Sequence, residues 1–223
     1  MPVIVVSNPK GGTGKSTTSL VIGTTLARHG ASVTVFDCDP NRHLEAWRTG
    51  PSQNPVKIIG HADSLNIARM LKAEASQRQF VVADLEGTAS LLVASAILAA
   101  DLVIIPTQGS AMDAAQAKRA ISFIDDQTAA VGPRPYKVLF TRTKPGFATR
   151  DEKVIRETLM KTGAPLFRTD LAERAAYRSM FTFRQSLEEL DPAAVNGVEK
   201  AIENADALVA EIVDDLRTTR KAA

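Results

Sequence analysis

Short apolar runs alternate along the chain with longer segments whose apolar residues recur every three or four positions. The runs predict buried strands at residues 3–6, 32–36, 56–59, 80–84, 102–106, 136–141 and 165–168. The longer segments predict helices ending near residue 30 and spanning about 63–76, 89–100, 113–130, 149–162, 169–180 and 191–217. Alternating strands and helices favour a three-layer, doubly wound α/β fold with a mostly parallel sheet. The 223 residues suit one domain, 1–223, with the helix at 191–217 packed on it.

The first predicted strand leads directly into a loop of glycines and lysines at residues 7–17, Ser-Asn-Pro-Lys-Gly-Gly-Thr-Gly-Lys-Ser-Thr. A strand, a glycine-rich loop, Lys-Ser and a helix form the context of a phosphate-binding P-loop. Glycines let successive backbone N–H groups face phosphate oxygens, and the helix presents its positive end to the same anion. Lys15 is expected to reach the β- and γ-phosphates, and the Ser16 hydroxyl to bind Mg²⁺. The residues expected to bind the nucleotide here are Gly11, Gly12, Thr13, Gly14, Lys15, Ser16 and Thr17. The alternative is a glycine turn with two solvated lysines.

Carboxylates follow two of the predicted strands. Asp37 and Asp39 end the strand at 32–36, and Asp84 ends four apolar residues in the strand at 80–84. In an open parallel sheet, such carboxylates lie over the ligand crevice. Asp84 is therefore expected to hold Mg²⁺ beside the loop, directly or through water. The alternatives are a pair of turn-forming aspartates before Pro-Asn and a plain aspartate at a strand end.

Composition excludes several classes of protein. Hydrophobic residues make up 44% of the chain, enough for a full core, and the single cysteine rules out an internal disulfide and a Cys-rich metal site. No apolar run approaches the ~18 residues of a membrane span, and no signal-peptide pattern precedes the loop, so a cytoplasmic protein is expected. The C-terminal end carries acidic residues and almost no apolar face, so membrane binding is not expected.

The formal net charge of +2 conceals an uneven distribution. Residues 134–184 contain twelve basic and five acidic side chains, whereas residues 185–216 contain nine acids and only Lys200. Such a basic segment attracts duplex DNA through its phosphates without reading bases. The candidate contacts are Arg150, Arg168, Arg174 and Arg178. The alternative is an ordinary set of surface cations.

The loop departs from the general P-loop pattern, because Pro9 stands where that pattern has glycine and Lys10 adds a lysine. This form resembles the deviant Walker A motif of the ParA/MinD family of P-loop ATPases. Asp-Cys-Asp-Pro-Asn at 37–41 is similar to the switch I region of small ParA proteins. The segment 106–113 resembles short partition ATPases such as ParF and VirC-type T-DNA transfer ATPases. Asp113 is expected to cap the helix at 113–130, with a dimer contact as the alternative.

The resemblance implies an ATP- and Mg²⁺-dependent DNA segregation ATPase, weakly active alone, for plasmid or chromosome partition. It implies an ATP-bound homodimer in which Lys10 reaches the partner's nucleotide, while Asp39 orients the attacking water and supports the Mg²⁺ shell. Thr141 and Arg142 are expected near the adenine. The implied partners are nonspecific DNA and a ParB-like centromere-binding protein, with the dimer located on the nucleoid.

Two other classes of function remain open. One is a VirC-like accessory ATPase for conjugative DNA transfer, or an ATPase that positions another cargo. The other is a metabolic enzyme on the same fold, such as an ATP-dependent ligase or an iron–sulfur reductase, although a single cysteine argues against the reductase.

Overall fold

A computed structural model of the chain describes residues 1–60, 66–87 and 90–222, the last three by their backbone alone. The strands are β1 (Val3–Val6), β2 (Val33–Cys38), β3 (Lys57–Ile59), β4 (Phe80–Leu85), β5 (Leu102–Thr107), β6 (Tyr136–Thr143) and β7 (Leu171–Ala172). The helices are α1 (Lys15–Arg28), α2 (His43–Arg48), α3 (Ile67–Gln77), α4 (Leu91–Leu98), α5 (Ala111–Thr128), α6 (Arg150–Lys161), α7 (Ala175–Phe183) and α8 (Val198–Ala222), with a 3₁₀ turn, η1, at Leu187–Glu189.

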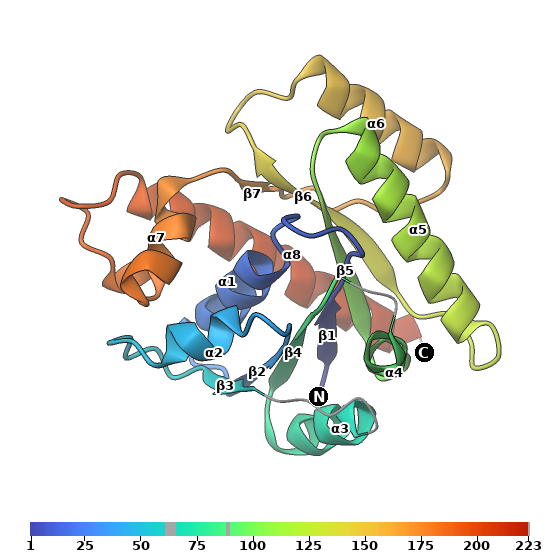
Figure 1. Cartoon of the computed structure of the whole chain (residues 1–223), viewed down its shortest axis with the longest axis horizontal. Coiled ribbons are helices and arrows are strands. Elements are labelled where there is room, and N and C mark those ends of the chain that lie inside the picture. Colours follow the sequence, from blue (N-terminus) through green and yellow to red (C-terminus); the bar gives the residue numbers. More distant parts are fainter. Residues whose placement is uncertain (61–65, 88–89, 223) are drawn as a thin grey trace.

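The seven strands form one sheet in the order β3-β2-β4-β1-β5-β6-β7, and every neighbouring pair is parallel. Helices cover both faces, with α1, α7 and α8 on one side and α3, α4, α5 and α6 on the other (Figure 1). The four residues of β1 are buried, as in a strand covered on both faces. The predicted three-layer, doubly wound α/β fold is confirmed, and the sheet is parallel throughout.

The strand order reverses at β1, which pairs with β4 on one side and β5 on the other. In an open α/β sheet, ligands bind beyond the carboxyl ends of the strands at such a switch point. The glycine-rich loop leaves β1 at this place and leads into α1 (Figure 1). The topology therefore places the loop beside the ends of β4 and β5, which come from distant parts of the sequence.

Three predicted elements differ from the structure. The helix predicted at 169–180 is wrong at its start, because residues 171–172 form β7 and α7 begins at Ala175. The run at 165–168 makes only one bridge, between Leu166 and Val138, and the paired strand β7 lies three residues further on. The C-terminal helix was expected to begin at Asp191, but that prediction is wrong, because α8 begins at Val198. Asp191 instead closes a turn by accepting the N–H of Ala193 at 2.9 Å. The expected start of the helix at 63–76 lies partly outside the described residues.

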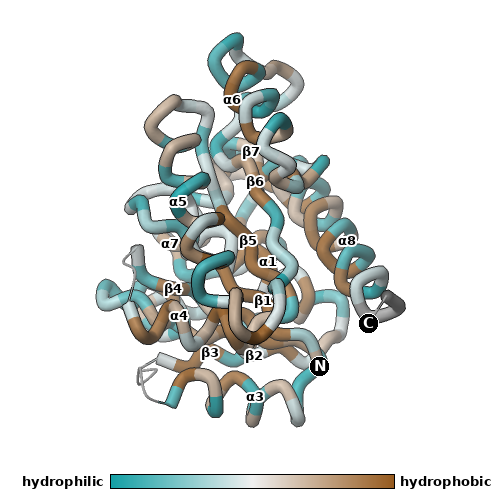
Figure 2. The backbone as a smooth tube through the Cα atoms, turned by 90° about the vertical axis from the view of Figure 1, so that its right-hand side faces the viewer, coloured by the Kyte–Doolittle hydropathy of each residue, from teal (hydrophilic) through white to brown (hydrophobic). Residues whose placement is uncertain are grey.

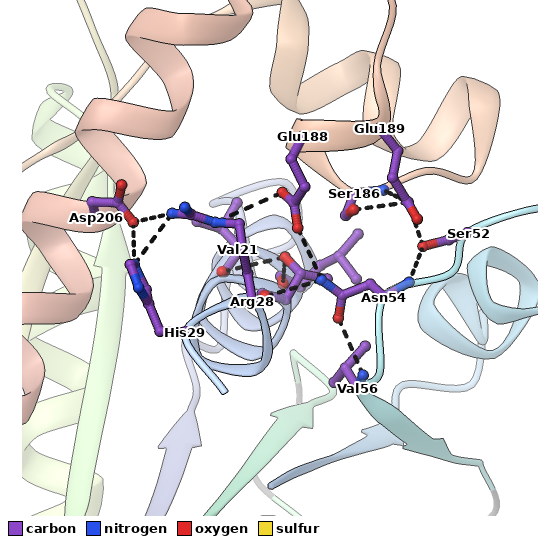
Figure 3. Close-up of polar contacts among 12 residues, drawn as sticks. Val21, Arg28, His29, Ser52, Asn54, Val56, Ser186, Glu188, Glu189 and Asp206 are labelled. Carbon is purple, nitrogen blue, oxygen red and sulfur yellow. Dashed lines mark hydrogen bonds and ion pairs between the residues drawn. The ribbon is translucent and has the colours of Figure 1, made fainter. Parts of the chain in front are cut away.

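Polar contacts fasten the C-terminal part of the chain to α1 (Figure 3). Arg28, in the last turn of α1, contacts Asp206 of α8 and lies 4.0 Å from Glu188 of η1. The amide of Asn54 donates to Glu188 at 3.1 Å and to the carbonyl of Thr24 at 3.1 Å. These contacts join α1, η1, α8 and the loop before β3 in one network.

One buried carboxylate links α8 to the end of the sheet. Figure 2 shows α8 alternating between hydrophobic and hydrophilic positions, as an amphipathic helix does. Glu211 is buried, accepts the N–H groups of Arg168 and Thr169 at 2.9 Å each, and lies 3.1 Å from the Lys137 ammonium. These donors hold the pKa of Glu211 below its usual value although burial opposes the shift. No helix within the described residues is long and apolar enough to span a bilayer.

Glu211→Ala is expected to lower the free energy of unfolding by about 1–3 kcal/mol, because the backbone N–H groups of Arg168 and Thr169 lose their buried acceptor. Glu203→Ala is the matched control, since Glu203 lies on the same helix in an exposed pair with Lys200. The control should change stability by less than about 0.5 kcal/mol. Urea titration followed by circular dichroism measures both. Equal losses in the two variants would contradict the role assigned to Glu211.

Candidate nucleotide-binding site

A hollow of about 530 Å³ opens at the carboxyl edge of the sheet, over the glycine-rich loop. Its lining combines the loop and the start of α1 with the segment after β2, Gly87 after β4, Arg142 near the end of β6 and Phe181 of α7. The lining residues are Gly11, Gly12, Gly14, Lys15, Ser16, Thr17, Asp39, Asn41, His43, Gly87, Arg142 and Phe181. Most of the sequence-predicted nucleotide and metal ligands therefore meet in one place.

The loop has the backbone of an anion cradle. Gly12 and Gly14 have φ angles of 75° and 93°, a region that favours glycine. Gly14 caps α1 without a side-chain hydrogen bond, so the first-turn N–H groups of α1 are directed to the hollow. Lys15 is buried, with its ammonium 3.2 Å from the carbonyl of Lys10. Burial lowers the pKa of Lys15, although the charges of nearby aspartates oppose this.

Side chains outside the glycine motif hold the loop in shape. The amide of Asn8 donates to the Pro106 carbonyl at 2.7 Å, and its oxygen accepts the N–H of Lys10 at 2.8 Å. Gln108 donates to the carbonyl of Gly12 at 2.8 Å. The Thr141 hydroxyl donates to the carbonyl of Thr13 at 2.7 Å. Sequence reasoning missed Asn8 and Gln108, and the only available signal was that each flanks a strand end at the predicted crevice.

Asp84 lies at the end of β4 and is fully buried. Its Oδ1 accepts from the Ser19 hydroxyl at 3.1 Å, whereas Oδ2 is buried and has no hydrogen-bond partner among the described residues. Burial raises the pKa of Asp84 to about 7, and the charge of Asp37 adds to the increase, while the hydroxyls of Ser16 and Ser19 and the charge of Lys15 oppose it. A carboxylate oxygen left without a partner beside a P-loop serine fits the oxygen ligands that Mg²⁺ takes.

The two aspartates after β2 have different surroundings. Asp37 is buried and accepts the N–H groups of Leu44 and Glu45 at 2.8 and 2.9 Å, so it holds the start of α2. Asp39 lines the hollow, and its Oδ1 accepts from the backbone and side-chain N–H groups of Asn41, both at 2.8 Å. Of this pair, only Asp39 is directed to the site where a nucleotide would bind.

Lys10 forms an ion pair within its own chain. Its ammonium lies 2.6 Å from Oδ1 of Asp113, whose side chain is 3% exposed, while that of Lys10 is 34% exposed. The other oxygen of Asp113 contacts the Ser110 hydroxyl. Asp113 is not the helix cap, contrary to the sequence prediction, because the Ser110 side chain caps α5 by accepting the N–H of Asp113. The two lysines of the loop thus point to different partners.

A second hollow of about 160 Å³ adjoins the first beyond Gly14 and Thr17. Thr141 and Arg142, the residues expected near the adenine, both line it. The register of β6 and β7 shifts between Thr141 and Thr143, and Arg142 has a φ of 54°. A bulge of this kind redirects a side chain, and Arg142 lines both hollows. Contact with the base remains a prediction.

The four arginines predicted to bind DNA are spread over different surroundings. Arg150 is exposed at the first turn of α6. Arg168 lies 3.7 Å from Glu211, and Arg178 lies 3.0 Å from Glu173. Arg174 lines the second hollow, and its Nε atom is buried without a hydrogen-bond partner among the described residues. The four arginines thus differ in their contacts, and their binding to DNA stays a prediction.

The parallel sheet, its switch point and the lysine-rich loop together define a P-loop protein of the ParA/MinD type. The chain belongs to the VirC1 protein family, whose family model matches residues 1–212.

The known relatives agree with this assignment. Protein ParA of Rhizobium radiobacter is 35% identical over 218 residues, covering 97% of this chain and 98% of that protein. Maintenance of carboxysome distribution protein A of Halothiobacillus neapolitanus is 26% identical over 182 residues, which cover 79% of this chain and 82% of that protein. A solved complex of a Cyanothece McdA variant with ATP matches with a TM-score of 0.74 at 16% identity, covering 95% of this chain and 96% of that one. The suspected ParA/MinD relationship is confirmed.

Asp84→Asn is expected to stabilise the protein at pH 8 without Mg²⁺. The pKa of Asp84 is raised from 3.8 to about 7, so ionisation of this buried group destabilises the folded state as pH rises through that interval. Removing the charge should raise the free energy of unfolding by up to about 4 kcal/mol, since each pKa unit corresponds to about 1.4 kcal/mol. If Asp84 binds Mg²⁺, the same variant should also lose any extra thermal stabilisation that appears when Mg²⁺ is added with ATP. Differential scanning fluorimetry measures both effects.

Asp39→Asn is the matched control for this experiment, because its carboxylate is half-buried and stays in contact with water. It should not gain stability at pH 8. A loss of stability in Asp84→Asn at pH 8 would show that the buried carboxylate does not oppose folding.

Proposed function

We propose that this protein is an ATP hydrolase that drives DNA segregation, with ATP and Mg²⁺ bound in the hollow over the glycine-rich loop. The observation that carries the proposal is the arrangement of the two loop lysines. Lys15 is buried beneath the loop, 3.2 Å from the carbonyl of Lys10, where a bound triphosphate would meet it. Lys10 is directed away from that position, toward α5. Lys15 thus binds the nucleotide of its own chain, and Lys10 can contact the nucleotide of a second chain.

The proposed chemistry follows from the residues in the hollow. The loop N–H groups, the α1 N-terminus and Lys15 bind the phosphates and hold the γ-phosphate for in-line attack. Ser16 and Asp84 would hold Mg²⁺, with Asp39 supporting the metal from the lining of the same hollow. When bound, the metal neutralises charge on the β- and γ-phosphates. Asp39, fixed by two hydrogen bonds from Asn41, orients the attacking water.

In the proposed active form, two ATP-bound chains face each other across their nucleotides. Lys10 leaves Asp113 and contacts the γ-phosphate of the opposite chain, where it stabilises charge that develops in the transition state. Because Lys10 is one-third exposed and its partner is almost fully buried, the lysine is the member of the pair that can move. Hydrolysis then depends on dimerisation, and a single chain turns over slowly.

The proposed partners are nonspecific DNA and a ParB-like protein that stimulates hydrolysis. Support for DNA comes from the basic segment 134–184, in which Arg150, Arg168 and Arg178 keep exposed side chains. A dimer that joins two such surfaces would bind the nucleoid within the cytoplasm. A second candidate is a VirC-like accessory ATPase for conjugative DNA transfer, which the family match over residues 1–212 favours. A positioning ATPase for another cargo agrees with the carboxysome-distribution relative.

Lys10→Ala is expected to keep ATP binding but to lose the ATP-dependent dimer, and with it at least about 90% of the hydrolysis, since catalytic electrostatic contacts contribute about 10²–10³ in rate. Lys15→Ala should lose ATP binding itself, and Asp39→Ala should accumulate an ATP-bound dimer. Light scattering with a non-hydrolysable ATP analogue, together with phosphate release, separates the three outcomes. A wild-type chain that stays monomeric with saturating analogue and Mg²⁺ would contradict the proposal.

Asp113→Asn is expected to strengthen the ATP-dependent dimer by about three- to tenfold, because Lys10 no longer breaks a charged hydrogen bond to reach the opposite nucleotide. Sedimentation velocity with the ATP analogue measures the dimer dissociation constant. Asp126→Asn is the matched control, since Asp126 is an exposed aspartate on the same helix. A weaker dimer in Asp113→Asn would mean that Asp113 acts in the dimer and does not restrain the single chain.

A further inference from the structure

The basic segment 134–184 divides into cations with partners and cations without. Five of its basic side chains are tied within the fold: Lys137 and Arg168 to Glu211, Arg156 to Glu152, Arg178 to Glu173, and Arg134 to the Leu98 carbonyl. By contrast, Lys144, Arg150 and Lys153 are exposed and form no ion pair within the described part of the chain. These three lie within ten residues of one another, in the connection from β6 to α6 and in the first turn of α6.

The stretch that carries these three cations also contains an exposed aromatic side chain. Phe147 is 65% exposed, although burying a phenylalanine is worth roughly 1.5–3 kcal/mol. It is the one aromatic residue of the stretch 144–153, which we call the Phe147 loop. The one acid on its surface is Asp151, because Glu152 is buried and bound by Arg156. The exposed part of this stretch therefore carries three cations, one acid and a single aromatic ring.

The loop holds Phe147 outward by its own turn chemistry. The N–H of Phe147 donates to the carbonyl of Lys144 at 3.2 Å and closes a four-residue turn. Pro145 occupies the second position, and Gly146, with a φ of 73°, occupies the third, as a type II turn requires. The exposed ring is thus presented by a turn that the sequence itself specifies.

The far end of the loop is anchored by α6. The Thr149 side chain caps α6 by accepting the N–H of Glu152 at 3.2 Å. Glu152 accepts two hydrogen bonds from Arg156, at 3.0 and 2.8 Å, and the Arg156 guanidinium lies 3.9 Å from the Phe140 ring centroid. The Phe147 loop is therefore fixed at both ends before any ligand arrives, which lowers the ordering cost of binding.

We infer that the Phe147 loop binds single-stranded DNA. Phe147 stacks on an unpaired base, and the three free cations contact the backbone phosphates on either side. Contacts to duplex phosphates need cations alone, whereas a base face is open to an aromatic ring only when the strand is unpaired. A membrane is a poorer fit, because a single exposed ring offers little apolar area and an acid follows in the next turn. Stable membrane anchoring needs a second anchor beside a basic patch. The inference goes beyond the proposed function, which needs only duplex DNA and the ATP-bound dimer.

Fluorescence anisotropy with a labelled 30-nucleotide oligo(dT), in the absence of ATP, tests the inference. Phe147→Ala should weaken binding about tenfold, and Phe147→Trp should restore it, because stacking of one base on an aromatic ring has about this effect. Phe183→Ala is the matched control, since Phe183 is 46% exposed on α7 outside the loop, and it should bind as the wild type does. Lys144→Ala with Lys153→Ala should reduce the slope of log Kd against log salt by about 1.4.

Three results would overturn the inference. The first is wild-type affinity for oligo(dT) in Phe147→Ala. The second is a loss of affinity in Phe147→Ala that is equally large for a blunt duplex of the same length, which would exclude stacking on an unpaired base. The third is binding of the wild type to vesicles of phosphatidylserine and phosphatidylcholine, lost in Phe147→Ala, with no binding to oligo(dT). Since the assay contains no ATP, failure of the ATP-dependent dimer would not affect it, and normal ATP hydrolysis in Phe147→Ala would separate the two claims.

Discussion

Parallel pairing of β1 between β4 and β5 is the constraint on which the rest of the structure depends. It brings the carboxyl ends of three strands from separate parts of the sequence to one edge, where the strand order reverses. The glycine loop at the end of β1 therefore lies beside Asp84 at the end of β4. Asn8 of this loop also donates a hydrogen bond to the carbonyl of Pro106 near the end of β5. Backbone N–H groups left open at the start of α1 make this edge suited to an anion.

The same edge places charges where they are costly for the empty protein. Asp84 is buried with one oxygen lacking a partner among the described residues, and its raised pKa shows that the ionised form is unfavourable there. Lys15 is buried nearby with a lowered pKa for the corresponding reason. A triphosphate with its metal would give the open Asp84 oxygen a partner and Lys15 an opposite charge, so ligand binding and folding stability are expected to be linked. Lys10 forms an ion pair with Asp113 in the single chain. In the proposed dimer, the nucleotide of the second chain would replace Asp113 as the partner of Lys10.

The basic segment shows how a charge count can mislead about a surface. Twelve cations between residues 134 and 184 indicate one extended patch in the sequence. In the folded chain, several of them pair with acids on α6, on α8 and just before α7. Three of the cations without an ion pair among the described residues lie in the same ten-residue stretch as Phe147, in the connection to α6 and its first turn. The charge count of the segment therefore overstates the number of unpaired cations that the folded surface presents.

The sequence by itself determined the fold class, the phosphate loop and the strand-end aspartates, because these depend on local periodicity and on residues adjacent along the chain. It failed at the start of α8, where Asp-Pro is a cap signal but closes a turn instead. Only the tertiary structure decided that Asp37 holds α2 while Asp39 faces the hollow, that Lys10 pairs with Asp113, and that Asn8 and Gln108 brace the loop. Each of these contacts depends on which strand ends become neighbours and on which side chains are buried. The spacing of residues along the chain determines neither the neighbours nor the burial.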